Sequence, residues 1–256
     1  MRVALMLEAC VNQGAGLQGV ALQAAPRVIA MASHGDQQGE LPLLWSLCST
    51  LVESGYSVMV LDANAIESDN NPGLVQLLDD AHWRDEELDK PESWSVLPAA
   101  LGLLKMSRSG VTQGLTLDPL GGLLQNFGVI VIYARAEVLV RLLQGSGIQP
   151  LLTVSALKTS PVTAYQALKK MLLHANLRPT VAKIVADFEV TSAEINRPEV
   201  DNLQQCAMEF LGYQIEPLTI RARQSKDRES TDISRLALRL LENAMPLRRH
   251  HFVESH

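Results

Sequence analysis

The stretch RVIAMASHGDQQGELPLLWSLCSTLVESGYSVMVLDAN, residues 27–64, decides the fold. It opens with an apolar run at 28–32, which has the length expected for a buried parallel strand. A polar, glycine-bearing turn at 33–39 is followed by apolar residues at helical spacing from Leu43 to Val52. Gly55 is placed as a helix C-cap, and 58–61 is apolar again. The order strand, loop, helix, strand predicts a βαβ unit, and in a P-loop fold the first loop of that unit holds phosphate.

The composition indicates one α/β domain of ordinary size. The 256 residues are 47% hydrophobic but only 4% aromatic, so aliphatic side chains must fill the core. The net charge of -6 and the pI near 5.5 argue against nucleic-acid binding, which requires a basic surface. The three cysteines fit a reducing cytosol and have no metal-ligand spacing. No apolar run is long enough for a bilayer and no signal peptide is expected, so we expect a cytoplasmic protein.

The stretch at 27–64 resembles, without a gap, the deviant Walker A region of the MinD/ParA family. The family pattern is close to xKGGxGKT, with an Asp-x-Asp ending the next strand, and it is matched here by Ser33, Gly39, Gly55 and Asp62. Two further stretches resemble family motifs: WSVLPA at 94–99 is similar to LxVLPAG, and TSPVTAYQALK at 159–169 is similar to T-S-x-x-D-A-Y-x-x-x-K. The resemblance implies a MinD/ParA-like, P-loop NTPase-like fold over most of the chain.

The departures from the family pattern fall on the residues that carry its chemistry. Gly35 stands at the signature-lysine position, Glu40 at the phosphate-binding lysine and Leu41 at the Mg²⁺-binding threonine. Asn64 replaces the second Asp, and Tyr133 replaces the Asp of the motif called switch II. A glutamate directed at the phosphate site repels phosphate, and loss of the hydroxyl removes a metal ligand. We therefore expect no ATP or Mg²⁺ binding, no metal site and no enzymatic activity, only the remnant of a nucleotide pocket.

The N-terminal segment resembles a second, narrower motif. Residues 12–18, NQGAGLQ, are similar to the DQAxGLR-type motif of FlhG proteins, the flagellar branch of the MinD family. In that branch the segment contacts a partner GTPase, FlhF, and stimulates it. The resemblance implies partner binding by Asn12, Gln13, Gly16 and Leu17. The alternative is a frayed terminal helix that packs Leu17 and Leu22 on the core.

Other features of the sequence have simple explanations. Ser33, His34 and Asp36 are too close in sequence to align as nucleophile, base and orienting group, so we expect an ordinary turn. The histidines near the C-terminus lack metal-ligand spacing. Basic residues interleaved with acidic ones favour a solvated loop, or else a contact to an acidic partner: Arg221, Arg223, Lys226 and Arg228.

These patterns predict a doubly wound, mostly parallel α/β sheet flanked by helices on both faces. We expect more strands at 94–99, 129–132, 151–154, 181–185 and 213–220, and helices from Pro72, at 119–124, from Ser160, at 197–211 and at 233–245. The last helix is short and lacks aromatic residues, which favours packing on the core over docking on a membrane. We divide the chain into a partner-binding segment at 1–26, the α/β domain at 27–246 and a tail at 247–256 that we expect to be disordered.

The sequence supports one main functional hypothesis and two alternatives. The main one is a non-hydrolysing, FlhG-like regulator or scaffold in flagellar assembly, number or placement, recruited to the inner membrane or cell pole only through a partner. Without nucleotide we expect a monomer, or a dimer formed by a surface other than the family's ATP-bridged one. One alternative is an active ATP-dependent dimerising switch with unusual pocket residues. The other is a pseudo-ATPase scaffold of another envelope machine, such as cellulose secretion or pilus positioning.

Overall fold

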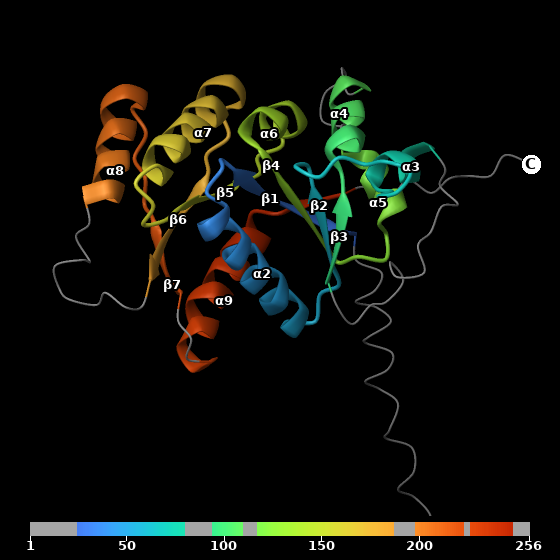
Figure 1. Ribbon diagram of the computed structural model, residues 1–256, viewed down its shortest axis with the longest axis horizontal. Helices are drawn as coiled ribbons and strands as arrows, with labels where there is room; N and C mark the ends of the chain where they lie inside the picture. The colour runs from blue at the N-terminus through green and yellow to red at the C-terminus, as the bar shows by residue number, and fades with distance from the viewer. Residues whose placement is uncertain (1–24, 80–93, 110–116, 187–197, 223–225, 248–256) are drawn as a thin grey trace, which may run out of the picture.

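The computed structural model describes residues 25–79, 94–109, 117–186, 198–222 and 226–247, and these residues form one α/β unit (Figure 1). The sheet runs in the order β3-β2-β4-β1-β5-β6-β7, and every neighbouring pair along this path is parallel. Its strands are β1 Arg27–Ser33, β2 Val58–Asp62, β3 Trp94–Pro98, β4 Val129–Arg135, β5 Leu151–Val154, β6 Thr180–Ala186 and β7 Leu218–Ala222. A two-residue strand, β8 Met245–Pro246, pairs antiparallel with the start of β1. The predicted doubly wound, mostly parallel sheet is confirmed.

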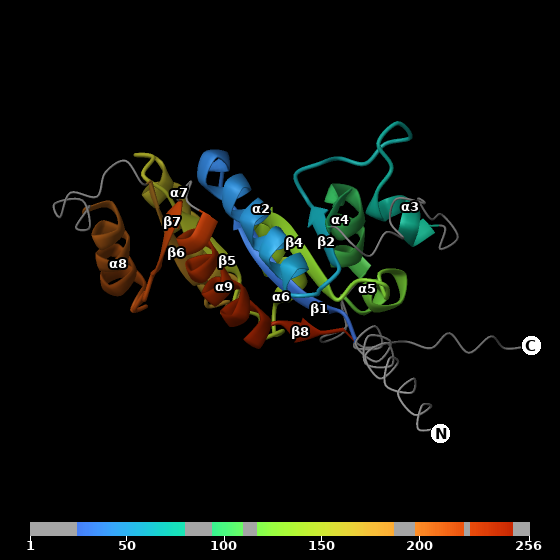
Figure 2. The same cartoon turned by 90° about the horizontal axis from the view of Figure 1, so that it is seen from below.

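Helices cover both faces of the sheet, and each face has its own apolar core (Figures 1 and 2). One face is covered by α2 Gln37–Glu53 and α9 Lys226–Glu242. The other face carries α3 Leu74–Asp79, α4 Ala100–Ser109, α5 Asp118–Leu123, α6 Ala136–Leu143, α7 Ser160–Ala175 and α8 Pro198–Leu211. The central strands β1 and β4 are buried on both sides, which explains their nearly continuous apolar sequences.

The first loop is shorter than predicted. We expected a turn over 33–39, but α2 begins at Gln37, so only His34–Asp36 separate β1 from the helix. The Asp36 carboxylate causes this early start, because its Oδ1 accepts a hydrogen bond from the Gly39 N–H at 3.2 Å, as an N-cap does. Three residues that would form the phosphate loop in a P-loop protein are therefore helical.

The C-terminal third differs from the prediction in three places. The strand expected at 213–220 is β7 at Leu218–Ala222. The expected loop is wrong for Arg221, which lies in β7, and for Lys226 and Arg228, which lie in the first turn of α9. That turn is polar and has no apolar period, so the sequence pattern located the helix only from Ile233 onward. Arg223 lies outside the described part of the chain. Leu247, which we placed in the tail, is buried, and its N–H donates to the Pro26 carbonyl at 2.8 Å. The other tail residues, 248–256, lie outside the described part of the chain.

Candidate functional site

The candidate site lies at the carboxyl edge of the sheet, where β1 and β4 end side by side. From there β1 leads into α2 on one face, whereas β4 leads into α6 on the opposite face (Figure 1). Such a point, where neighbouring strands send their connections to opposite sides, is where open α/β sheets bind ligands. Six of the residues singled out from the sequence gather at this edge: Ser33, Gly35, Glu40, Asp62, Asn64 and Tyr133.

Glu40 is the centre of the site, and it points inward. Its side chain is completely buried, and Oε1 accepts hydrogen bonds from the His34 N–H at 2.9 Å and the Asp36 N–H at 3.0 Å. The carboxylate therefore does not project as a repelling charge into an open phosphate site, as we had expected. Instead it occupies two backbone donors of the loop itself, which are the type of donor that holds phosphate in a P-loop.

Tyr133 closes the site from the neighbouring strand. Its hydroxyl donates a hydrogen bond of 2.5 Å to Oε2 of Glu40, a residue 93 positions away in the sequence. Burial raises the pKa of the Tyr133 phenol above its ordinary value, and the hydrogen bond to Glu40 raises it further. The Ser33 hydroxyl also hydrogen-bonds the phenol and opposes this shift. Tyr133 thus stays protonated and supplies a third donor to the Glu40 carboxylate.

The side chain of His34 anchors the β1–α2 loop to β5 and α7 by hydrogen bonds. The imidazole is 2% exposed, with Nε2 2.9 Å from the Thr153 carbonyl oxygen and Nδ1 2.8 Å from Oγ1 of Thr163. A carbonyl only accepts, so Nε2 carries the proton, and in the neutral ring Nδ1 accepts from the Thr163 hydroxyl. Nε2 also lies 3.5 Å from Oε1 of Glu40, but both ring nitrogens are engaged by Thr153 and Thr163 and the Asp36 carboxylate caps α2, so Ser33, His34 and Asp36 do not align as nucleophile, base and orienting group. The expected structural role of Ser33, His34 and Asp36 agrees with this geometry.

The other residues predicted for the pocket have structural roles or lie apart. Gly35 has a φ of 96°, in the left-handed region where glycine is favoured. Gly39 is buried, and Leu41 is 46% exposed on α2 and does not line the pocket. The Asp62 carboxylate accepts from the Asn64 backbone N–H at 2.8 Å, which forms a local turn. Within the described ranges, no group of His, Cys, Asp and Glu side chains could hold a metal ion. Asn12, Gln13, Gly16 and Leu17 lie outside those ranges.

A second buried glutamate was missed from the sequence. Glu67, in the loop after β2, accepts hydrogen bonds from the Leu101 N–H at 2.7 Å and the Gly102 N–H at 2.8 Å. It therefore caps α4 from a distance. One sequence signal was available, because Ala99 and Ala100 at the start of α4 have no side chain that could cap the helix.

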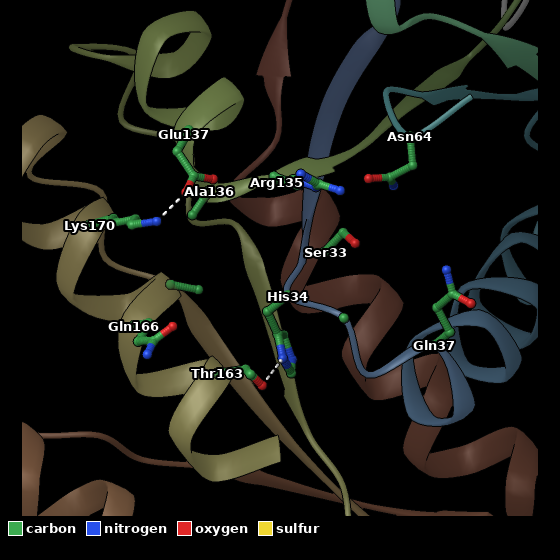
Figure 3. A pocket seen from close by; sticks show the side chains of 12 residues that line it. Ser33, His34, Gln37, Asn64, Arg135, Ala136, Glu137, Thr163, Gln166 and Lys170 are labelled. Carbon is green, nitrogen blue, oxygen red and sulfur yellow. Dashed lines mark hydrogen bonds and ion pairs between the residues drawn. The ribbon is translucent and has the colours of Figure 1, made fainter. Parts of the chain in front are cut away.

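A polar pocket of about 440 Å³ adjoins the Glu40 site (Figure 3). Four segments line it: the β1–α2 loop, the turn after β2, the start of α6 and one side of α7. Arg135 and Asn64 face each other across the pocket, and Lys170 forms an ion pair with Glu137 at the other end. This ion pair is the main reason why the pKa of Glu137 is lowered. Of the residues that line this pocket, only Ser33, Gly35 and Asn64 were expected there from the sequence.

Comparisons with solved structures identify the fold. The MinD cell division protein of Aquifex aeolicus is 15% identical and matches with a TM-score of 0.52, over 86% of this chain and 99% of MinD. The MinC:MinD complex of the same organism gives 0.52 at 16% identity, over 88% of this chain and 99% of the matched chain. Cobyrinic acid a,c-diamide synthase from Mycobacterium smegmatis, with bound ATP analogue and magnesium, gives 0.51 at 14% identity, over 88% and 100%.

These likenesses establish the fold: a mostly parallel sheet flanked by helices, as in MinD-type P-loop NTPases. No protein-family profile and no curated protein sequence matches the chain. Among the described residues, none of the helices combines the length and the apolar character that crossing a membrane requires.

Proposed function

We propose that this protein is a pseudo-ATPase of the MinD/ParA type that acts as a regulator or scaffold in flagellar assembly, as FlhG-like proteins do. The observation that carries the proposal is the Glu40 carboxylate, which accepts two loop N–H groups and the Tyr133 hydroxyl. In this proposal the carboxylate is a built-in substitute for a bound phosphate group.

Three physical arguments support the loss of nucleotide binding. The loop donors that would hold a phosphate already bind a carboxylate, and exchange would have to bring a second anion beside the first in a poorly screened site. The loop itself is reduced to three residues between β1 and α2. The magnesium-binding hydroxyl is replaced by Leu41, and Tyr133 stands in place of a carboxylate.

Calorimetric titration with Mg-ATP tests this part of the proposal. We expect a Kd of about 1 mM or weaker, no hydrolysis, and no change in molar mass by light scattering when ATP is added. Glu40→Lys should not restore hydrolysis, because the metal ligands remain absent. Micromolar binding or an ATP-induced dimer would show instead an active dimerising switch.

The regulatory part of the proposal places function on surfaces of the protein. The MinC:MinD complex is a precedent for a protein partner on this fold. Here the proposed partner is an FlhF-like GTPase, bound through Asn12, Gln13, Gly16 and Leu17. A segment ahead of the sheet can become ordered on a partner, with Leu17 as the apolar anchor.

Titration of the full chain against such a GTPase tests the partner assignment. Burying one leucine is worth about 1.5–3 kcal/mol, so Leu17→Ala should weaken binding roughly ten- to a hundredfold. A truncated chain that starts at Ala25 should not bind, yet should keep the melting temperature of the full chain. Equal binding by the full and truncated chains would disprove the role of the N-terminal segment, and absence of binding by the full chain would disprove the flagellar assignment.

A further inference from the structure

The pocket beside Glu40 has the size and polarity of a site for a small polar ligand. Its volume of about 440 Å³ falls within the range of small-molecule pockets. Its lining contains hydroxyl, amide and charged side chains and the imidazole of His34, with no aliphatic side chain larger than alanine. The side-chain amides of Gln37 on α2, Asn64 in the turn after β2 and Gln166 on α7 surround the same space (Figure 3). The Asn64 amide also donates to Oδ1 of Asp62 at 3.2 Å. A flat apolar molecule would find nothing to pack against here.

The charge of the pocket selects for an anion. Arg135 and Lys170 are cations and Glu137 is the only carboxylate among the lining residues. Lys170 and Glu137 neutralise each other through their ion pair, whereas no described carboxylate lies within ion-pair distance of Arg135. Arg135 acts electrostatically on Glu137 but forms no ion pair with a described carboxylate, so two cations and one carboxylate line the pocket of a protein whose net charge is -6. A guanidinium binds carboxylate and phosphate groups with two parallel hydrogen bonds.

The Glu40 site explains why this anion is not a nucleotide. Glu40 already accepts from two loop N–H groups, those of His34 and Asp36, so the acidic group of a ligand is directed to Arg135, at the end of β4. Apart from the imidazole of His34, which is held by hydrogen bonds to Thr153 and Thr163, the lining offers no aromatic or large aliphatic surface on which a base could stack.

We propose that this pocket binds a small, non-aromatic organic anion, with its phosphate or carboxylate group on Arg135 and its polar body on Gln37, Asn64 and Gln166. The inference rests on the proposed loss of nucleotide binding. Since the pocket is built from the ends of β1 and β4 and from α6 and α7, its occupant fixes these elements relative to one another.

The test is an NMR titration of the ¹⁵N-labelled full chain at constant ionic strength, with glycerol 3-phosphate in one arm and citrate in another. We expect saturable shifts of the side-chain amide signals of Gln37, Asn64 and Gln166 with at least one probe. Arg135→Gln should weaken binding about tenfold or more, because a charge-assisted bidentate contact is lost. Arg141→Gln is the matched control: it removes the same charge from the same helix region but lies outside the pocket, and should bind like the wild type.

The outcomes separate the two anion types and the two proposals. Binding of only one probe would support the pocket and identify the acidic group that it accepts. Failure of both probes to saturate, or equal weakening by both arginine substitutions, would overturn the inference. A third arm with Mg-ATP reports on the Glu40 site: micromolar shifts in loop residues 34–41 would refute the pseudo-ATPase proposal, whereas the effect of Arg135→Gln on the two probes would still decide the pocket.

Discussion

Glu40 and Glu67 are both buried, and each accepts two backbone N–H groups, but they differ in the origin of these donors. The donors of Glu40 precede it by six and four residues, so the carboxylate folds back on the loop before its own helix. Glu67 bonds residues 34 and 35 positions ahead and joins the loop after β2 to α4. Only Glu40 has a third donor, the Tyr133 hydroxyl.

Under the proposed function, this difference separates a structural cap, Glu67, from a carboxylate that takes the place of a ligand, Glu40. Glu67 caps the start of α4, which has no capping side chain of its own. Many helices need such a cap, because their first N–H groups have no partner within the helix. Glu40 satisfies donors at the point of the sheet where this fold binds its ligands, and a neighbouring strand contributes the tyrosine that holds the carboxylate in place. The same hydrogen bonds therefore have different consequences when they are removed, and three substitutions examine this.

The largest effect is expected from Glu40→Ala, which leaves three buried donors without a partner. At roughly 1–3 kcal/mol for each unsatisfied donor, partly offset by release of a buried charge, the free energy of unfolding should fall by about 4 kcal/mol. Urea unfolding measures this. If the carboxylate replaces a ligand, added phosphate should recover part of the loss by binding the freed loop N–H groups. If phosphate does not restore any of the lost stability, Glu40 is only a structural cap, as Glu67 is.

Glu67→Ala should lower the free energy of unfolding by about 3 kcal/mol, because two donors lose a charged acceptor. Phosphate should not recover this loss, since the surroundings are closely packed: a Cβ on Gly73 would lie 2.1 Å from the Pro98 carbonyl oxygen and 2.7 Å from Cγ of Glu67. The control is Glu53→Ala at the exposed end of α2, which should change stability by no more than about 0.5 kcal/mol. If phosphate restores the stability of the Glu40 and Glu67 variants equally, the two glutamates do not differ in this way.

Tyr133→Phe should have the smallest effect, a loss of about 1.5 kcal/mol near neutral pH for one charged hydrogen bond. The substitution should also change how the free energy of unfolding depends on pH in the alkaline range. Because the folded-state pKa of Tyr133 is raised above about 10, its contribution is fully present below pH 10 and is lost as the pH rises through the folded-state pKa. Stability of the Phe variant should therefore fall less steeply above about pH 10. Cys48 and Tyr213, whose pKa values are also raised, remain in both proteins. Identical slopes would contradict the Tyr133–Glu40 contact.

The sequence was sufficient for the sheet because its strands are short apolar runs separated by turns, and such runs are visible locally. It also identified Glu40 and Tyr133 as departures from a family pattern. Their contact was not predictable, since it joins residues 93 positions apart and depends on the parallel register of β1 and β4. Glu67 was missed for the same reason, because its partners lie on α4, a helix whose short sequence we had not recognised.

Element boundaries failed where polar residues set them. The N-cap by Asp36 moved the start of α2 into the predicted loop, and the polar first turn of α9 resembled a solvated segment. In both cases the first helical turn is polar in sequence and precedes the apolar face, so hydrophobic periodicity alone places the start too late.

The hydrogen bond between Leu247 and Pro26 joins the two ends of the described fold, and β8 lies antiparallel to the start of β1 there. The first and last described residues therefore lie close together, at the same edge of the sheet. The same closeness makes the domain suited to circular permutation, with a linker across the old ends and new ends in an exposed loop.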